Sequence, residues 1–566
     1  MRTLRESTMT KEQKIHDNSE EKIKKLLTEI KKLREENEEL KSRKKKYGIV
    51  WEEEKELEKV VLECKEKIPI LKDIKDKEIL TDENKPMNIL IEGDNYHALQ
   101  VLNYTHKGKI DVIYIDPPYN TGKANEWKYN DRYVDENDTY RHSKWLNFMD
   151  KRLQLAKDLL NEDIGIIFIS INDIELSQLK LLCNKFFGEN NVEIMIWYKI
   201  PKEGAAGQGK MKITHRFRLD HEYILVCYKN KNKLKFNKPL RIKKVKNNYG
   251  NLDNDPRGDW VSCEICKSET KSNPLGKNYY SIKTSKGRII KRQWHMSYEE
   301  FLELDKDKRI YWGSGKIIPR LKKFINEPRP ITPSSIIMGI SQTEANNELK
   351  ELFGKKVFDN PKPLNLIKWI LEMSSKKDSI ILDYFAGSGT TGHAVIDLNK
   401  EDSGQRKFIL CTNDENGICT EVCYPRLSKV IKGYNGNKGI KSNLKYFKTN
   451  FVDVGNIYKI SDEKKIELTY KAGEMIAIRE DAFEEVEKNE WWQIFKNKNK
   501  TVSVYFREDQ SKLEKLFEKN KNTRAIIYLF SWGKNELKAQ EYGYDNIEIK
   551  DIPQPIIEVY KEINSL

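Results

Sequence analysis

The stretch Ile110-Asp111-Val112-Ile113-Tyr114-Ile115-Asp116-Pro117-Pro118-Tyr119 decides the fold of this chain. Its first six residues are mostly β-branched and apolar, which is typical of an interior strand in a parallel sheet. Open α/β sheets bind ligands beyond the carboxyl ends of their strands, and Asp116 lies at such an end. Pro117 and Pro118 fix two φ angles and remove two backbone donors, so their carbonyls are free to accept hydrogen bonds from a ligand.

The end of this strand suits the exocyclic amine of a nucleobase. An amine offers two N–H donors, of which Asp116 can accept one and the Pro117 carbonyl the other. Tyr119 adds an aromatic face on which a base extruded from a duplex can stack. The alternative is an ordinary strand with a proline turn, in which Tyr119 only packs. The polar, glycine-containing segment Asn120-Thr121-Gly122 favours a site mouth over a core.

A second buried-strand pattern, Ser379-Ile380-Ile381-Leu382, leads into Asp383-Tyr384-Phe385-Ala386-Gly387-Ser388-Gly389-Thr390-Thr391. Gly387, Gly389 and Gly392 satisfy G-x-G-x-x-G ahead of a helix-like stretch. The pattern predicts a loop that holds a nucleotide-like cofactor at a strand end.

Two cofactor classes fit this loop. A nicotinamide dehydrogenase shows the same glycines, and Asp414 or Glu415 lies at about the distance of its ribose-binding acid. Asp383 before the glycines, Phe385 beside them and the late position of the loop in the chain favour a methyl donor. A phosphate-binding P-loop does not fit, because His393 rather than lysine follows Gly392.

The order of these two segments resembles the β group of DNA amino-methyltransferases, in which DPPY precedes the cofactor loop. More narrowly, residues from about 46 to 445 are similar to the modification (Mod) subunit of type III restriction-modification systems. Besides the two motifs, the phrases that carry this narrower resemblance are Tyr47-Gly48-Ile49-Val50-Trp51, Ile91-Glu92-Gly93-Asp94-Asn95, His142-Ser143-Lys144-Trp145-Leu146-Asn147-Phe148-Met149, Asp255-Pro256-Arg257-Gly258-Asp259-Trp260 and Asn360-Pro361-Lys362-Pro363-Leu364-Asn365-Leu366.

The resemblance implies a role for each matching residue. The catalytic residues, which hold the target adenine, are Asp116, Pro117, Pro118 and Tyr119. The residues that bind S-adenosyl-L-methionine are Asp383, Phe385, Ala386, Gly387, Gly389, Thr390, Lys362, Pro363, Asp94 and Asn413. Lys362 and Pro363 match a segment near the methionine end of the cofactor, and Asp94 a carboxylate near its adenine. Asn413 stands where many relatives place a ribose-binding acid, which leaves Asn413, Asp414 and Glu415 as alternatives for that contact.

The resemblance also implies an α/β, Rossmann-like methyltransferase with a mostly parallel sheet. Its activity is transfer of a methyl group to the exocyclic amino group of an adenine flipped out of double-stranded DNA. A sulfonium methyl is already activated, so we expect no metal. The implied partners are DNA, a second copy of the chain in a homodimer and a restriction (helicase-nuclease) subunit. The alternatives are a cytosine N4 amino-methyltransferase, or a DNA-recognition and assembly subunit with weak activity alone.

Charge is concentrated in one part of the chain. The net charge is +15, and residues 231–330 hold 25 Lys and Arg against 11 Asp and Glu, a difference of +14. The alternative explanation is a lysine-rich, AT-biased genome. Such a bias accounts for the total net charge better than for its localisation in one segment. The same segment carries aromatic residues that suit base readout: Tyr249, Trp260, Tyr279, Tyr280, Trp294, Tyr311 and Trp312.

We therefore expect five parts. These are an N-terminal helix or coiled coil (1–45), the first part of the methyltransferase core (46–230), a target recognition domain (231–356), the second part of the core (357–445) and a small C-terminal α/β assembly domain (446–566). The seam of Ile23, Leu26, Ile30, Leu33, Asn37 and Leu40 suits a short coiled coil, with a surface helix as the alternative. In the C-terminal part, residues 501–506 and 525–530 are predicted strands and 511–519 a helix.

Other classes of protein are excluded by what the sequence lacks. Eight cysteines in 566 residues give no secreted disulfide framework. Cys263-Glu264-Ile265-Cys266 is a lone C-x-x-C, for which ordinary thiols are favoured over structural zinc. No apolar run reaches transmembrane length and the N-terminus is charged rather than signal-like. We expect a cytoplasmic protein with no membrane partner.

Overall fold

A computed structural model describes residues 58–121, 141–200, 217, 219–241, 249–313, 318–532 and 537–565 of the chain. Three of the sequence features named above lie outside these ranges: the predicted N-terminal helix or coiled coil at 1–45, the segment at 47–51 and Gly122. The chain separates into two compact units. Residues up to 235 together with 335–566 form the larger unit, and 236–334 form the smaller one.

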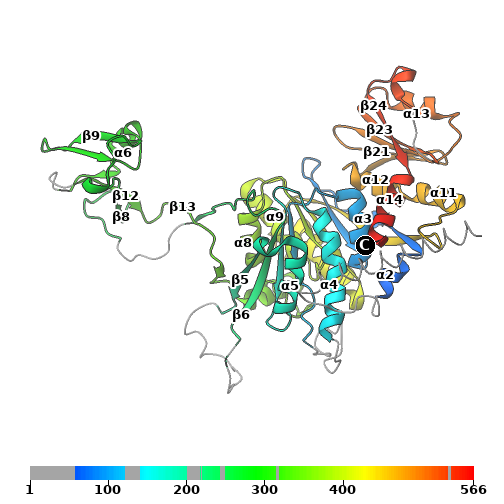
Figure 1. The fold of residues 1–566 in the computed structure, drawn as a ribbon, viewed down its shortest axis with the longest axis horizontal. Helices are drawn as coiled ribbons and strands as arrows, with labels where there is room; N and C mark the ends of the chain where they lie inside the picture. The colour runs from blue at the N-terminus through cyan, green and yellow to red at the C-terminus, as the bar shows by residue number, and fades with distance from the viewer. Residues whose placement is uncertain are drawn as a thin grey trace, which may run out of the picture. The chain divides into compact units, whose positions relative to one another are not determined.

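The larger unit is built on a ten-stranded sheet that is mostly parallel, as predicted (Figure 1). Six neighbouring strands, from β19 to β4, run parallel, whereas β1 and β6 are antiparallel to their neighbours. In spatial order the strands are β1 (Lys67–Asp73), β19 (Asn443–Asp453), β2 (Met87–Glu92), β16 (Lys407–Thr412), β15 (Ile380–Asp383), β3 (Val112–Ile115), β4 (Ile166–Ile171), β6 (His221–Tyr228), β5 (Val192–Tyr198) and β14 (Ile336–Ile337).

Helices cover both faces of this sheet (Figure 1). One packed group is α3 (Asn95–His106), α4 (Arg141–Leu159) and α5 (Leu176–Phe187); the other is α8 (Leu364–Ser374), α9 (Thr390–Asp402) and α10 (Tyr424–Lys432). Every residue of β3 and of β4 is buried. This two-sided burial explains why the central strands are continuous apolar runs rather than alternating ones.

The sheet brings the two predicted strand tips together. β3 and β15 are parallel neighbours, and Ile113 lies opposite Leu382. The chain leaves β3 toward β4 on one side and leaves β15 toward β16 on the other. This is a topological switch point, where open α/β sheets place their ligand sites. Asp116 and Asp383 therefore reach the same edge of the sheet.

The smaller unit has its own core and sheets. It holds β7 (Leu240–Arg241), β8 (Trp260–Cys263), the hairpin of β9 (Tyr279–Lys283) and β10 (Ile289–Gln293), α6 (Tyr298–Lys306), β11 (Ile310–Tyr311), β12 (Arg320–Phe324) and β13 (Arg329–Pro330). Trp260 and Trp294 are each 2% exposed, and Trp294 packs in the core. The prediction that these two rings read bases is therefore wrong, because a buried ring has no face to offer a nucleotide.

The smaller unit ends earlier than the predicted 231–356 domain. Ser335 begins a return to the main sheet, where β14 pairs with β5. Trp197 donates from Nε1 to the carbonyl of Ile340 at 2.9 Å. The helix that follows, α7 (Gln342–Phe353), is part of the larger unit. Residues 335–356 thus pack with the large sheet, although their sequence resembles the polar segment before them.

The C-terminal part forms a second sheet of five strands, in the order β20 (Glu484–Lys488), β21 (Trp492–Lys496), β22 (Thr501–Tyr505), β23 (Ala525–Phe530) and β24 (Ile547–Ile552). The predicted strands at 501–506 and 525–530 are confirmed as β22 and β23, and the predicted helix as α13 (Leu513–Asn520). The main sheet continues past the expected boundary at 445, since β19 runs to Asp453.

The other α-helices that the structure describes are α2 (Lys59–Glu63), α11 (Asp462–Lys471), α12 (Gly473–Arg479) and α14 (Gln554–Ser565).

Candidate active site

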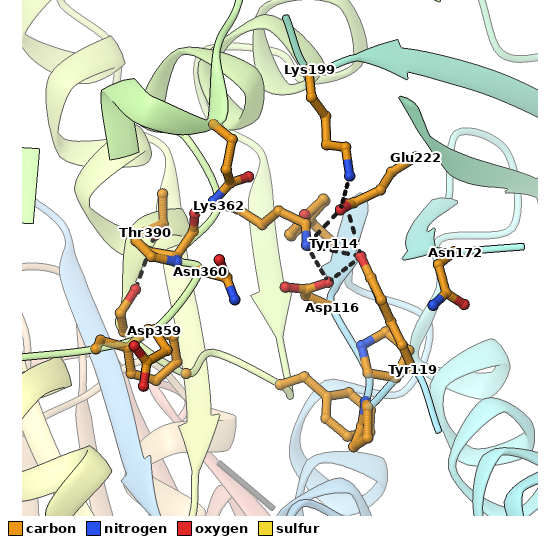
Figure 2. Close-up of a pocket in the computed structure, with 18 of the residues that line it drawn as sticks. Tyr114, Asp116, Tyr119, Asn172, Lys199, Glu222, Asp359, Asn360, Lys362 and Thr390 are labelled. Atoms are coloured by element: carbon orange, nitrogen blue, oxygen red, sulfur yellow. Dashed lines mark hydrogen bonds and ion pairs between the residues drawn. The ribbon is translucent and has the colours of Figure 1, made fainter. Parts of the chain in front are cut away.

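A cavity of about 370 Å³ lies at the switch point (Figure 2). All four predicted catalytic residues line it. Of the ten predicted cofactor residues, six line it as well: Asp383, Phe385, Ala386, Gly387, Thr390 and Lys362. Gly389, Pro363, Asp94 and Asn413 are not among its lining residues. The structure therefore brings most of the two motifs into one enclosed space.

Asp116 is the centre of a charged cluster at one end of this cavity (Figure 2). Its Oδ1 accepts a hydrogen bond from the Tyr119 hydroxyl at 2.9 Å and pairs with the Lys362 ammonium at 2.9 Å. Glu222 faces the same two groups, with 3.2 Å to the Tyr119 hydroxyl and 3.4 Å to Lys362 Nζ. Lys199 pairs with the other oxygen of Glu222 at 3.2 Å. Lys362 thus contacts the catalytic side of the cavity, a contact that the sequence did not predict.

Burial and the neighbouring charges act in opposite directions on the pKa of each of the three ionisable groups in this cluster. Burial raises the pKa of Asp116, and the Lys362 ammonium acts against this rise. Burial also works to raise the pKa of Glu222, but Lys362 and Lys199 outweigh it, and the pKa is lowered. For Lys362, burial alone lowers the pKa, but Asp116 and Glu222 outweigh it and the pKa is raised. Lys362 therefore stays cationic between two carboxylates.

The Asp-Pro-Pro-Tyr turn is held from outside the cavity. Trp145 on α4 donates from Nε1 to the Pro118 carbonyl at 2.8 Å. Asn120 adopts a left-handed φ of 56° and donates to Glu175 at 2.6 Å. Within the described part of the chain, no hydrogen bond to the Pro117 carbonyl is found. That carbonyl is therefore available to a ligand. The expectation that the Pro118 carbonyl is free as well is wrong, because it already accepts from Trp145.

The glycine loop that follows β15 is organised by Asp383. One carboxylate oxygen accepts from the Phe385 backbone N–H at 3.0 Å and the other from the Thr391 hydroxyl at 2.5 Å. Burial nevertheless raises the pKa of Asp383 to about 7, because these two bonds only partly offset the loss of water. Gly387 and Gly389 have φ values of 49° and 78°, a left-handed region that favours glycine. The loop then enters α9, whose first N–H groups suit an anionic or polar ligand.

Asp94 and Asn413 lie at the ends of the next two strands, β2 and β16. Asp94 caps α3 by accepting from the Tyr96 N–H at 2.7 Å, and its carboxylate lies 3.6 Å from Arg152. The Oδ1 atom of Asn413 is buried, and no described residue donates a hydrogen bond to it. By contrast, the Asp414 carboxylate is occupied by Thr420, which donates from its backbone N–H and its hydroxyl, each at 2.9 Å.

Sequence reasoning missed Glu222, Lys199 and Asn172, all of which line the cavity. Glu222 directly precedes the apolar sequence Tyr223-Ile224-Leu225-Val226-Cys227, which is typical of a strand, so a charged residue at a strand end could have been noticed. What the sequence does not give is the direction of β6. This strand is antiparallel to β4, with Tyr223 opposite Ile171, so its first residues lie beside the carboxyl ends of the parallel strands.

Two further sequence expectations concern metals and membranes. Among the residues that the structure describes, no group of three or more His, Cys, Asp or Glu side chains is placed to hold a metal ion. Cys266 is buried and Cys263 is partly exposed. No described helix is both long enough and apolar enough to span a bilayer.

Comparison with known proteins places this site in a family. Residues 110–424, more than half of the chain, match the family model described as DNA methylase. The chain belongs to the DNA methylase family. The matched range includes both the Asp116 turn and the Asp383 loop, and it removes the dehydrogenase alternative.

Three relatives illustrate how far the similarity of this DNA methylase extends. It is 35% identical to the type III restriction-modification enzyme StyLTI Mod subunit of Salmonella typhimurium, over 62% of this chain and 57% of that protein. It is 32% identical to the EcoPI Mod subunit of Escherichia phage P1, over 59% of each chain. It is 34% identical to the type II methyltransferase M.KpnI of Klebsiella pneumoniae, over 64% of this chain and 88% of that protein. The alignments thus span less than two thirds of the length of the two Mod subunits.

Proposed function

We propose that this DNA methylase transfers a methyl group from S-adenosyl-L-methionine to the exocyclic amine of an adenine, as the Mod subunit of a type III restriction-modification system. The observation that carries the proposal is the shared cavity, in which the Asp116 turn faces the Asp383 loop. The fold that goes with it is a Rossmann-like methyltransferase with an inserted target recognition domain. The similarity to two Mod subunits supports the system to which it belongs.

The residues around the cavity fit this cofactor. Asp383 offers a carboxylate for an ammonium group, and Gly387 lines the cavity with no side chain in the way. Asn413, at the end of β16 and outside the cavity lining, has a buried oxygen that bonds no described residue. We therefore assign it the ribose contact in preference to Asp414, whose carboxylate is already occupied. When bound, S-adenosyl-L-methionine supplies an electrophilic methyl group on a sulfonium.

The target amine is held at the other end of the cavity. Asp116 accepts one of its hydrogens through Oδ2, since Oδ1 already bonds Tyr119 and Lys362. The Pro117 carbonyl accepts the second hydrogen. Positive charge that develops on the amine nitrogen during attack is stabilised by the Asp116 carboxylate, which then receives the released proton. Lys362 lies 4.9 Å from the Tyr119 ring centroid, so the opposite face of the ring is the one we assign to base stacking.

The partners follow from the same proposal. Double-stranded DNA is the substrate, and a restriction subunit is inferred from the Mod relatives. Assembly as a homodimer is inferred from the resemblance to the Mod family. The alignment with M.KpnI, which covers 88% of that methyltransferase, favours a second candidate: an enzyme that methylates DNA without a restriction subunit.

Methylation-sensitive long-read sequencing of DNA from cells that express only this chain tests the proposal. We expect N6-methyladenine within one short DNA word. Methylation at cytosine N4 would replace adenine as the target base. A chain that binds DNA but leaves it unmethylated until a restriction subunit is added would instead be mainly an assembly subunit.

Cofactor affinity should depend on pH through Asp383. Its pKa of about 7 means that the carboxyl is increasingly protonated as the pH falls below 7, and a neutral carboxyl does not attract an ammonium. Binding below pH 7 must therefore release one proton, and the affinity should fall roughly tenfold per pH unit on the acid side. Above that pH the affinity should be flat. Titration calorimetry in two buffers of different ionisation enthalpy measures the proton directly. Asp383→Asn should bind weakly at every pH and release no proton; a steep acid limb in this variant would refute the assignment.

DNA affinity should depend on salt through the hairpin of β9 and β10. Lys283, Lys286 and Lys291 on this hairpin are exposed, and the smaller unit carries most of the net positive charge of the chain. Replacing all three by glutamine should reduce the slope of log affinity against log salt by about 0.9 for each side chain that contacts a phosphate. Electrophoretic or anisotropy titrations of the full chain measure the slope. The matched control removes three lysines of the C-terminal part, Lys515, Lys519 and Lys521, and should keep the wild-type slope.

A further inference from the structure

We propose that Glu222 is a positioning residue for methyl transfer: it anchors Tyr119 and Lys362 so that Asp116 presents one carboxylate oxygen to the target amine. The inference rests on the proposed function of the same cavity and adds a residue for which the sequence patterns predicted no role. It also gives Lys362 a task on the catalytic side, in addition to its predicted place near the cofactor.

The contacts around Asp116 are unequal between its two oxygens. The Tyr119 hydroxyl and the Lys362 ammonium both reach Oδ1, each at 2.9 Å. Lys362 also donates to the Tyr119 hydroxyl at 2.8 Å, so the three groups form a closed triangle. A carboxylate that is fixed through one oxygen has a fixed direction for the other. Oδ2 is thereby aimed by the protein before the base arrives, which is the preorganisation that positioning catalysis requires.

Glu222 holds this triangle from the opposite side. Its Oε2 lies 3.2 Å from the Tyr119 hydroxyl and 3.4 Å from Lys362 Nζ, the two groups that also contact Asp116, and the single hydroxyl proton is shared between the two carboxyl groups. Its Oε1 is fixed by Lys199 at 3.2 Å, so Glu222 is itself anchored on β6 and at the end of β5. Figure 2 shows the side chains of Asp116, Tyr119, Lys362 and Glu222 converging, with Lys199 reaching Glu222 from above in this view. Without Glu222, Asp116 would be the one carboxylate among the described residues that pairs with Lys362, and the ammonium would compete with the amine for both oxygens of Asp116.

The charges that face Asp116 make the role of Glu222 measurable. The titratable groups that interact electrostatically with Asp116 are Lys362, Glu222, Tyr119 and Tyr114, together with Asp383 on the other side of the cavity. The negative charge of Glu222 raises the pKa of Asp116, whereas Lys362 lowers it. Removing the charge of Glu222 should therefore move the acid limb of the rate profile to lower pH. Removing the charge of Lys362 should move it to higher pH.

The test is the single-turnover rate of methyl transfer by the full chain as a function of pH. The probe is unmethylated genomic DNA with labelled S-adenosyl-L-methionine at saturation, so that Asp383 is held ionised by the cofactor. E222Q should lower the rate by about ten- to a hundredfold, the range for a lost hydrogen bond to a charged group. E222A should lower it further, because glutamine keeps one acceptor oxygen. The acid limb should move down in E222Q and up in K362M, and the cofactor dissociation constant should stay within about twofold of wild type in E222Q.

The chain offers a matched control on the same pair of strands. Glu193 on β5 accepts from the Tyr228 hydroxyl at 2.7 Å and pairs with Lys231 at 2.6 Å, but it does not line the cavity. E193Q removes the same charge from a similar Tyr-Glu-Lys arrangement. It should keep both the wild-type rate and the wild-type acid limb.

If Glu222 only stabilises the fold and does not position the catalytic groups, these measurements give different results. If E222Q matches E193Q in rate and in acid limb, or if its rate falls with no movement of the acid limb, the inference is overturned. Y119F provides a second measurement, because it can be combined with E222Q in a double-variant cycle. If Glu222 acts through the Tyr119 hydroxyl, the loss in the double variant should be smaller than the product of the two single losses, and independent losses would overturn the inference. A wild-type chain that methylates no DNA would overturn the proposed function itself.

Discussion

Replacing Asp116 by alanine is expected to lower the single-turnover rate of methyl transfer by about 100- to 1,000-fold, the loss typical when one preorganised group that stabilises transition-state charge is removed. Asp116 is the carboxylate at the end of β3, and it accepts from Tyr119 and pairs with Lys362 through one oxygen. Its other oxygen is the acceptor that we assign to the amine. Alanine removes both the acceptor and the negative charge opposite the developing cation.

Cofactor binding separates this effect from a general loss of structure. Among the described residues, no hydrogen bond or ion pair joins Asp116 to the residues that organise the glycine loop, where Asp383 bonds Phe385 and Thr391. Asp116→Ala should therefore bind S-adenosyl-L-methionine with nearly wild-type affinity by calorimetry. Asp116→Asn keeps the shape of the side chain and should also be severely impaired, because it lacks the charge. Wild-type rates in either variant at saturating substrate would remove Asp116 from the mechanism.

Replacing Gly387 by valine is expected to have the second largest effect, on cofactor affinity. Gly387 lines the cavity and has a φ of 49°, a conformation that is strained for a β-branched residue. A Cβ there would lie 3.4 Å from the Phe358 ring, so the rest of the side chain must enter the cavity or push that ring aside. The expected loss is about 2 to 3 kcal/mol of binding, or roughly 30- to 150-fold in the dissociation constant.

Gly354 gives the matched control for this substitution. It ends α7 with a φ of 72°, and a Cβ at this position would meet nothing within 4 Å. Gly354→Val should cost about 1 kcal/mol or more of folding stability from backbone strain. Its cofactor affinity should be that of the wild type. If Gly387→Val binds the cofactor as tightly as Gly354→Val does, the glycine loop is not the cofactor site.

The central strands could be predicted from the sequence, because a strand that is buried on both faces is a continuous run of apolar residues. The run 110–115 and the run 379–382 became β3 and β15, with bounds within two residues of the expectation. The sequence also predicted the site residues correctly where they are contiguous in the chain and form one motif. The Asp-Pro-Pro-Tyr turn and the glycine loop line the same cavity.

The sequence predicted the boundaries of the smaller unit and the exposure of its aromatic side chains less well. The segment 335–356 is polar, like the unit before it, yet it packs with the main sheet through β14 and α7. Trp260 and Trp294 have aromatic rings that suit base contact, but both are buried. Composition does not tell on which side of a short strand the core lies, because that is decided by partners distant in the sequence.

By itself, the sequence determined the fold class, the two motifs and the family, because each depends on residues that are contiguous or on a repeating pattern of burial. Only the tertiary structure decided what surrounds Asp116. Glu222 and Lys362 lie more than a hundred and more than two hundred positions along the chain from it, and they reach it because β6 runs antiparallel and the segment before α8 returns to the cavity. Electrostatic interactions act over ångströms in space, so the charge state of Asp116 is a property of the folded sheet edge rather than of the segment that contains it.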